Sequence, residues 1–259
     1  MLAFICLPGF VEHKQLLSLS LIIINVLTAW KIPTKCRELD EILEGGLASG
    51  EISLIYGEPE TAKTTMAIQC SVSCAEKGLK TLFVDCDGTF STKRLMQIAS
   101  KNFEKIAERI ILARPKDFGE QTIIIDKLAD YVTKDFGLLV IDALTTLYRA
   151  ELAENPEKRF ELNRELNRQM AWLAQISRTK RIAVLITSQV RSVFDENLAH
   201  VEPVATRVLK FWADTIMAMK LTENIRIIKV SVEKKSKTGK TDFCYLKIEE
   251  KGLTDYKPA

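Results

Sequence analysis

The segment Ile52–Thr65, ISLIYGEPETAKTT, decides the fold of this chain. It opens with Ile52–Tyr56, an apolar run of the length and composition of a buried strand. Gly57 follows, then four residues and the triplet Ala62-Lys63-Thr64, which leads into a stretch with helical periodicity. Except at Ala62, this is the pattern in which backbone N–H groups and a helix N-terminus surround the phosphates of a nucleotide. The segment therefore predicts a strand, a phosphate-binding loop and a helix.

The side chains of this loop have distinct chemical tasks. Lys63 brings a full positive charge to the β- and γ-phosphates, and the Thr64 hydroxyl is a suitable ligand for Mg²⁺. Ala62 stands where the pattern has Gly; if its φ is positive, Ala costs about 1–2 kcal/mol relative to Gly. A plain left-handed turn that caps a helix is the alternative interpretation. The predicted phosphate-binding residues are Gly57, Glu58, Pro59, Glu60, Thr61, Ala62, Lys63, Thr64 and Thr65.

The rest of the chain after Ile32 repeats this alternation of short apolar runs and helical periods. Such a pattern is typical of β–α units stacked around a mainly parallel sheet. The tail from Thr215 to Glu249 changes to an antiparallel pattern. We therefore predict an α/β fold, a mainly parallel twisted sheet with flanking helices and a C-terminal antiparallel extension. Strands are predicted at 52–56, 81–85, 110–113, 138–141, 182–188, 216–220, 225–232 and 243–248, and helices at 38–43, 64–77, 93–100, 120–133 and 159–178.

Composition narrows the function without deciding it. The 259 residues are 47% hydrophobic and 27% charged, which suits a folded globular core. A formal charge of +3 indicates no large basic surface for nucleic acid or membrane, so any basic site must be local. The six cysteines contain no Cys-x-x-Cys pair, which argues against structural zinc and favours reduced thiols in a cytoplasmic protein.

The first thirty residues differ from the rest. Polar residues interrupt the apolar run 16–30, which is shorter than the roughly 20 residues of a membrane helix. Residues 1–10 lack the positive charge with which a secretory signal begins. We expect neither a membrane span nor export. We divide the chain into 1–30, an accessory segment or upstream extension, and 31–259, the core.

A carboxylate follows one of the predicted buried strands. Asp142 ends the apolar run Leu138–Ile141, and ligands of open α/β sheets bind outside the carboxyl ends of the strands. We expect Asp142 to lie beside the loop at Gly57 and to hold Mg²⁺ through the water shell of the ion. A turn former or helix cap is the alternative.

Two more acids end another strand, in the sequence FVDCDGTF of residues 83–90. Period-two alternation places Asp85 and Asp87 on the same side of the strand end. One of them could polarise a water molecule for attack on a γ-phosphate. Asp87 is the better candidate, because Gly88 lets the chain turn over the site; an Asx turn is the alternative.

The densest basic cluster is KKSKTGK, residues 234–240, between two predicted strands. Four lysines in one hairpin turn would follow a phosphate backbone with salt-sensitive affinity. Lysines on a hairpin also increase solubility and block edge pairing, so a solvated turn is the alternative. The cluster supplies the DNA-binding candidates Lys234, Lys235, Lys237 and Lys240.

Four blocks in order and spacing resemble the RecA-type recombinase core, specifically the archaeal RadA and RadB group and its eukaryotic relatives. They are GEPETAKTT (57–65), FVDCDGTFSTKRLMQIA (83–99), LLVIDALTTLYRAEL (138–152) and VLITSQV (184–190). The resemblance extends over about residues 31–256. It implies a RecA-type P-loop NTPase fold, ATP and Mg²⁺ as cofactors, and a role in homologous recombination and DNA repair.

The resemblance also assigns roles position by position. It makes Lys63 a catalytic as well as a phosphate-binding residue, keeps Asp142 as a metal site, and makes Asp87 the counterpart of the family's catalytic Glu. It places Arg94 where the family lays an Arg against the adenine face. Gln189 takes the place of a Gln that senses the γ-phosphate and couples it to the DNA-binding loop.

By the same resemblance, two segments occupy the places of the family's DNA loops. They are RAELAENPEKRF, residues 149–160, and VRSVFDENLAHVEPVATR, residues 190–207. An aromatic ring among such cations can stack on a base. Acidic residues in the second segment favour plain solvated surface as the alternative. The candidates are Arg149, Lys158, Arg159, Arg191, Phe194 and Arg207.

Departures from the family pattern refine this expectation. Asp87 is one methylene shorter than Glu, which together with Ala62 predicts slow hydrolysis. The full recombinases carry an N-terminal helical DNA-binding domain and a Phe-x-x-Ala segment before the core, whereas this sequence has about thirty residues there, most of them apolar, and no Phe-x-x-Ala. A RadB-like accessory paralog therefore fits better than a filament-forming recombinase.

The combined prediction is an ATP-binding recombinase paralog with weak DNA-dependent ATPase activity. Its expected partners are DNA, single-stranded in the first instance, and the main recombinase or other paralogs; homo-oligomer formation stays open. One alternative is a nucleotide-gated accessory module of the main recombinase that does not hydrolyse ATP. The other is a KaiC-like signalling ATPase, since that branch shares the same core motifs.

Overall fold

The computed structural model describes residues 30–195, 198–203, 205–235 and 242–257. For residues 191–195, 198–203 and 206 it describes the backbone only. Residues 1–29 lie outside the described part, so the accessory role of the segment 1–30 stays a prediction. Helices within the described ranges are all too short or too polar to cross a membrane.

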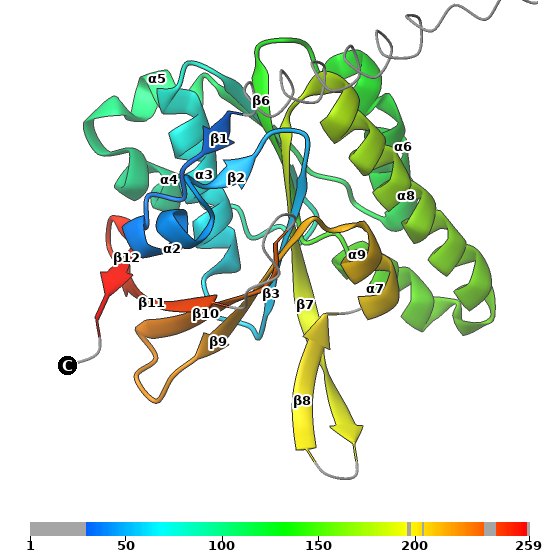
Figure 1. Ribbon diagram of the computed structural model, residues 1–259. Coiled ribbons are helices and arrows are strands. Elements are labelled where there is room, and N and C mark those ends of the chain that lie inside the picture. Colours follow the sequence, from blue (N-terminus) through cyan, green and yellow to red (C-terminus); the bar gives the residue numbers. More distant parts are fainter. Residues whose placement is uncertain (1–29, 196–197, 204, 236–241, 258–259) are drawn as a thin grey trace, which may run out of the picture. The chain divides into compact units, whose positions relative to one another are not determined.

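Within the described residues, ten strands form one sheet in the order β12-β11-β10-β9-β3-β7-β6-β4-β5, with β8 paired to β7 beside this path (Figure 1). The six neighbours from β9 to β5 run parallel, and β9 to β12 are antiparallel. This arrangement confirms the predicted fold class. The strands are β3 (Ile52–Gly57), β4 (Lys80–Asp85), β5 (Ile110–Ala113), β6 (Phe136–Asp142), β7 (Ala183–Asp195), β8 (Leu198–Pro203), β9 (Thr215–Leu221), β10 (Ile227–Lys234), β11 (Asp242–Glu249) and β12 (Gly252–Tyr256). A separate pair joins β1 (Lys31–Ile32) to β2 (Leu47–Ala48).

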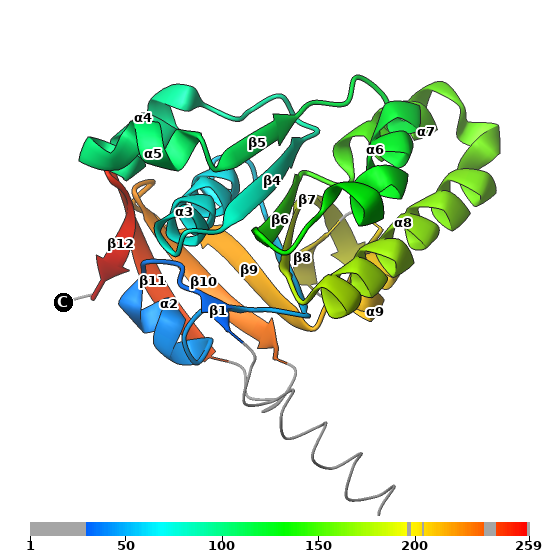
Figure 2. The same ribbon diagram turned by 90° about the horizontal axis from the view of Figure 1, so that it is seen from above.

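Helices cover both faces of the parallel part of the sheet. On one face α3 packs with α4 and α5, and on the other α8 packs with α6, α7 and α9 (Figure 2). Side chains cap the N-termini of two of these helices: Ser91 and Asp117 each accept a hydrogen bond from a backbone N–H of the first turn. The helices are α2 (Arg37–Ile42), α3 (Lys63–Glu76), α4 (Thr92–Ala99), α5 (Phe103–Ala107), α6 (Phe118–Tyr131), α7 (Thr146–Glu154), α8 (Arg159–Lys180) and α9 (Thr206–Trp212), with 3-10 turns η1 (Ser100–Asn102) and η2 (Pro156–Lys158).

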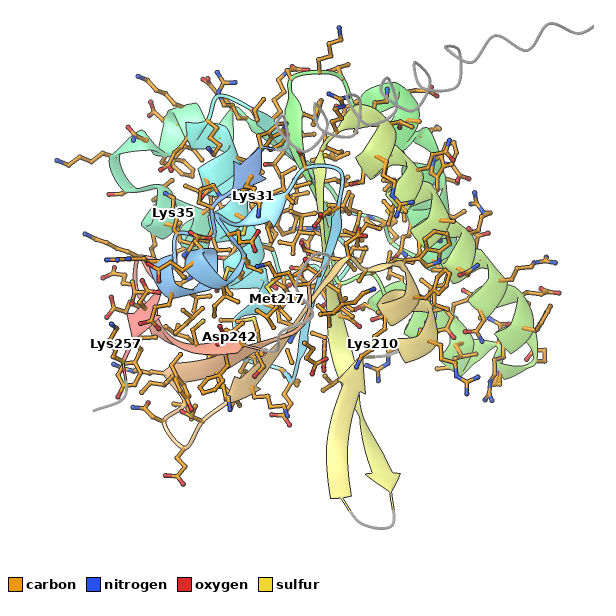
Figure 3. All side chains as sticks on the ribbon, in the orientation of Figure 1. Lys31, Lys35, Lys210, Met217, Asp242 and Lys257 are labelled. Atoms are coloured by element: carbon orange, nitrogen blue, oxygen red, sulfur yellow. The ribbon has the colours of Figure 1, made fainter. Side chains whose placement is uncertain are left out.

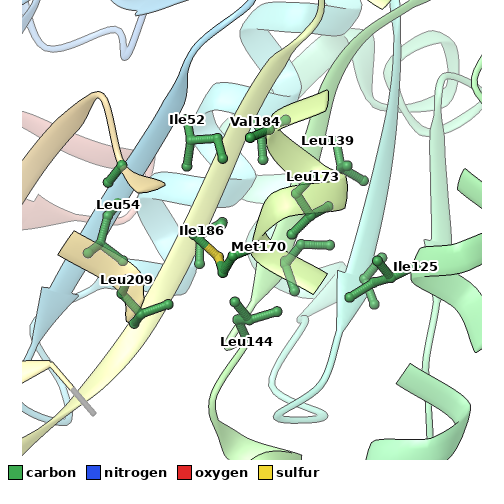
Figure 4. Close-up of a cluster of buried hydrophobic side chains, with 14 of the residues drawn as sticks. Ile52, Leu54, Ile125, Leu139, Leu144, Met170, Leu173, Val184, Ile186 and Leu209 are labelled. Carbon is green, nitrogen blue, oxygen red and sulfur yellow. The ribbon is translucent and has the colours of Figure 1, made fainter. Parts of the chain in front are cut away.

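The core explains why the central strands read as continuous apolar runs. Every residue of β3 and of β6 is buried, since helices cover both faces. On the α8 side, Leu54 of β3 and Ile186 of β7 belong to the same buried cluster as Met170 and Leu173 of α8 (Figure 4). This packing fixes the carboxyl ends of β3, β6 and β7 relative to one another.

Two segments predicted as loops are regular structure. Residues 149–160 form most of α7, the turn η2 and the start of α8. Tyr148 fixes the position of α7. Its ring centroid lies 5.9 Å from that of Phe118, and its hydroxyl donates a hydrogen bond to Oδ1 of Asn163 at 3.0 Å. Within the segment 190–207, the residues that the structure describes form the outer part of β7, β8 and the first turn of α9, with Val190 paired to Pro203. The run VRSVF in this segment has the β-branched and aromatic residues that favour a strand, which the loop prediction overlooked.

Candidate nucleotide-binding site

The loop from Gly57 to Ala62 connects the carboxyl end of β3 to α3. A Cβ at Gly57 would lie only 2.2 Å from the carbonyl oxygen of Met219 on β9, so this position requires glycine. Thr61 is fully buried, and its hydroxyl donates to the carbonyl oxygen of Glu58 at 2.8 Å. These contacts fix the loop backbone without a ligand.

Ala62 occupies the left-handed region, with φ 63° and ψ 27°, directly before the first residue of α3. Ala62 therefore has the positive φ that makes Ala less favourable than Gly at this position. Its carbonyl oxygen still accepts the helical hydrogen bond from the N–H of Met66 at 3.0 Å. The loop thus keeps the geometry of the phosphate-binding pattern at a cost in stability.

Lys63 reaches back across the loop. Its ammonium donates to the carbonyl oxygens of Gly57 at 2.9 Å and Glu58 at 2.7 Å. Burial lowers the pKa of Lys63, and the nearby carboxylates of Asp142 and Asp87 oppose this shift. A cation held by neutral carbonyl groups beside a pocket can turn toward an anionic ligand without breaking a strong ion pair.

Asp142 ends β6 and is only 1% exposed. Its Oδ1 accepts a hydrogen bond from the Thr187 hydroxyl at the end of β7, while its Oδ2 is buried without a hydrogen-bond partner among the described residues. Burial raises the pKa of Asp142 to about 6, although the hydrogen bond from Thr187 and the nearby Thr64 hydroxyl oppose this shift. A buried carboxylate oxygen without a partner, next to the Thr64 hydroxyl, fits a hydrated Mg²⁺ ion.

The two acids at the carboxyl end of β4 have different tasks. Asp85 is fully buried and accepts hydrogen bonds from Arg114 and from the N–H groups of Thr89 and Phe90, so it stabilises the turn after β4. It thus fits the alternative interpretation, in which the acid forms a turn. Asp87 alone of the two lines the pocket at the carboxyl ends of the strands.

These residues surround one pocket of about 330 Å³ at the carboxyl ends of β3, β4, β6 and β7. Predicted phosphate, metal and catalytic residues from four separate sequence blocks are therefore neighbours. The lining residues are Pro59, Glu60, Ala62, Lys63, Thr64, Thr65, Asp87, Thr89, Asp142 and Gln189.

Gln189 and Arg94, both assigned by resemblance, lie differently with respect to this pocket. Gln189 lines it, and its amide oxygen accepts a hydrogen bond from the Arg149 guanidinium at 2.6 Å. Arg94 on α4 does not line it; its guanidinium donates to the carbonyl oxygen of Glu250 at 2.8 Å, between β11 and β12. A role for Arg94 at an adenine ring stays a prediction.

The DNA-binding candidates divide into exposed and engaged side chains. Lys158, Arg159 and Arg207 are exposed, and Phe160 beside them is 78% exposed. Side chains of Arg191 and Phe194, and residues Lys237 and Lys240 altogether, lie outside the part that the structure describes.

The lysines at the end of β10 contact their own fold. Lys234 donates to the carbonyl oxygen of Ala213 after α9 at 2.5 Å, and Lys210 of α9 (Figure 3) lies 3.4 Å from Glu233. Lys235 pairs with Glu44 at 2.5 Å, and its side chain is only 13% exposed. The ammonium groups of Lys234 and Lys235 thus have partners within the fold, and DNA binding by these lysines stays a prediction.

Several contact residues of the site carried no signal in the sequence. Thr146 and Thr187 donate hydroxyl hydrogen bonds to Asp87 and Asp142, and Thr89 lies 3.4 Å from the Thr64 hydroxyl. Threonines are common, and only the tertiary fold shows which of them face a carboxylate. Thr187 could have been inferred from its position at the end of a buried parallel strand.

Comparison with known proteins agrees with this geometry. Residues 27–256 match the family model described as Rad51. The DNA repair and recombination protein RadB of Methanococcus maripaludis is 31% identical over 215 residues, which cover 83% of this chain and 96% of that protein. The protein of the same description from Methanosphaera stadtmanae is 36% identical over 188 residues, or 72% and 79% of the two chains.

A solved structure described as the crystal structure of the RadB recombinase is similar over the same core. It has a TM-score of 0.76 and 33% sequence identity, and the match covers 87% of this chain and 100% of that one. The matched region contains all four sequence blocks and the pocket between them. By sequence and by fold, this chain belongs to the Rad51 family.

Proposed function

We propose that this chain is an ATP-binding recombinase paralog of the RadB kind that acts in homologous recombination and DNA repair. The names of its relatives support the process, and they favour it over KaiC-like signalling. The observation that carries the proposal is the convergence of Lys63, Thr64 and Asp142 on one pocket behind a phosphate-binding loop.

Thr64 and Asp142 would hold the Mg²⁺ ion of the bound nucleotide. The buried Oδ2 of Asp142, which has no partner in the described structure, would accept a hydrogen bond from a water of the ion's shell. Bound Mg²⁺ would neutralise negative charge on the phosphates. Lys63 would exchange its bonds to the loop carbonyl groups for bonds to phosphate oxygens.

Asp87 would act as the base that orients the attacking water. It lines the pocket, but its Oδ1 already accepts the Thr146 hydroxyl, and it has a shorter reach than Glu. Hydrolysis would therefore be slow, and we propose that single-stranded DNA stimulates it. The same observation favours a second candidate, a nucleotide-gated accessory module that binds ATP and does not hydrolyse it.

The exposed side chains Lys158, Arg159 and Arg207 would contact a single-stranded DNA backbone. Phe160, exposed in the first turn of α8, offers a ring on which a base could stack. A change of nucleotide would reach this surface through α7, which begins four residues after Asp142. The main recombinase or another paralog would bind the nucleotide-loaded form.

ATP turnover with and without single-stranded DNA tests the proposal. The native chain, Lys63→Ala and a control, Lys77→Ala, should be compared, with nucleotide binding followed in the same samples. Lys77 is an exposed lysine at the opposite end of α3, so the control removes an equal charge away from the pocket. DNA-stimulated turnover lost only in Lys63→Ala supports the ATPase, binding without turnover supports the gated module, and absence of nucleotide binding contradicts both.

A further inference from the structure

The first turn of α7 holds two pocket residues at once. The Thr146 hydroxyl donates to Oδ1 of Asp87, and Nη1 of Arg149 donates to Oε1 of Gln189 at 2.6 Å. Nε2 of Gln189 in turn lies 3.5 Å from Oδ2 of Asp87, at the far end of hydrogen-bond range. Four side chains, from the turn after β4, from α7 and from β7, therefore form one chain of contacts at the edge of the pocket.

This chain fixes which end of the Gln189 amide faces the pocket. A guanidinium has donors only, so the group that Arg149 contacts must be the amide oxygen. An ionised carboxylate has acceptors only, so the group that faces Asp87 must be the NH₂. Both neighbours thus require the same amide orientation. In this orientation the NH₂ group of Gln189, which lines the pocket, faces into it.

The orientation suits one class of ligand group. A terminal phosphate offers acceptors only, and the NH₂ group of Gln189 is the part of the amide that can bond to it. With the amide turned over, its oxygen would face the phosphate and repel it. The contact from Arg149 is charge-assisted and short, so it is the stronger of the two that set the orientation.

We infer that Arg149 is a positioning residue, one that orients the Gln189 amide so that the pocket recognises a γ-phosphate. This inference rests on the proposed nucleotide site and goes beyond it. It also gives Arg149 a task inside the molecule: its guanidinium engages Gln189 rather than a DNA backbone. Arg149 is exposed on α7, so its substitution should leave the fold intact.

The test compares the affinities for ATPγS and ADP, which differ by the terminal group, in native protein, Arg149→Met and Gln189→Ala. Arg149→Met should lower the ratio of ATPγS to ADP affinity roughly ten- to a hundredfold, the effect of one hydrogen bond to a charged group. Gln189→Ala should do the same, and the double variant should lose no more than either single variant. Arg164→Met removes another exposed arginine, on α8, and should leave the ratio unchanged.

Each outcome decides the inference. An equal loss for both nucleotides, no loss at all, or additive losses in the double variant would overturn the positioning role while the nucleotide site stands. Gln189→Glu gives a second readout, because a carboxylate still accepts from Arg149 but offers no donor to the phosphate; it should bind ADP normally and ATPγS weakly. If the native chain binds neither nucleotide, the proposed function fails, and the positioning role fails with it.

Discussion

Ala62 is the residue where the sequence departs from the phosphate-binding pattern, and its backbone keeps the conformation that the usual Gly would adopt. Its φ of 63° is in the left-handed region. Replacing it with Gly, Ala62→Gly, should raise the free energy of unfolding by about 1 kcal/mol, since the cost of a Cβ in this conformation exceeds the gain in chain entropy of Gly in the unfolded state.

Urea unfolding of the two proteins measures this difference. Ala153→Gly is the matched control, because Ala153 is exposed in the right-handed helix α7 and its substitution should lower stability by about 1 kcal/mol. A destabilised Ala62→Gly variant would contradict the assigned backbone conformation.

Asp142 makes the stability of the metal-free protein depend on pH. Its pKa of about 6 in the folded protein lies above the value of about 4 for an unfolded chain, so the folded state binds the proton more tightly. The free energy of unfolding should therefore fall as pH rises from about 4 to about 6, by up to about 3 kcal/mol for this group, with no further change from it above that window.

Unfolding measured without Mg²⁺ between pH 4 and 7.5 checks this prediction. Asp142→Asn cannot ionise, so the difference in stability between native protein and variant should change across the window. Parallel curves for the two proteins would show that Asp142 titrates with an ordinary pKa.

At the scale of elements, the turn after β4 depends on one partly exposed ion pair. The Asp85 carboxylate is fully buried, whereas the Arg114 side chain that pairs with it at 2.9 Å is 53% exposed. Arg114→Ala would leave a buried carboxylate with two backbone N–H groups as its partners, and should lower the free energy of unfolding by about 2 kcal/mol.

Denaturation of Arg114→Ala beside Arg109→Ala measures the effect. Arg114 follows β5 and Arg109 precedes it. The Arg109 guanidinium donates to the carbonyl oxygen of Gly78 at the surface, so Arg109→Ala should lower the free energy of unfolding less than Arg114→Ala does. Equal losses would mean that the Asp85 pair adds nothing particular to this turn. If the pair does hold the turn, Arg114→Ala should also displace Asp87 from the pocket.

Elements with a simple hydrophobic period could be predicted from the sequence, and those set by tertiary packing could not. The buried strands β3 and β6 are continuous apolar runs. The residues at their carboxyl ends, Gly57 and Asp142, indicated where the site lies. Helix α7 was missed because its shape depends on contacts of Tyr148 with α6 and α8. Strand β7 continues past the core to Asp195 because it pairs with β8, a contact between residues that no local pattern reveals.

The whole molecule brings together residues up to about 130 positions apart in the chain. Lys63, Asp87, Asp142 and Gln189 meet because parallel strands present all their carboxyl ends at one edge of the sheet. The strand ends alone predicted this meeting for Lys63, Asp87 and Asp142, whereas Gln189 was assigned by resemblance. The sequence could not predict the hydrogen bonds of Thr146 and Arg149 from α7, which depend on how that helix packs.

Calorimetric titration of the native chain with ATPγS, in the presence and absence of Mg²⁺, tests the central claim most directly. The account predicts saturable binding that Mg²⁺ strengthens, that Lys63→Ala abolishes and that Lys77→Ala leaves unchanged. Binding unaffected by Lys63→Ala, or no binding by the native chain, would contradict the assignment of this pocket to a nucleotide.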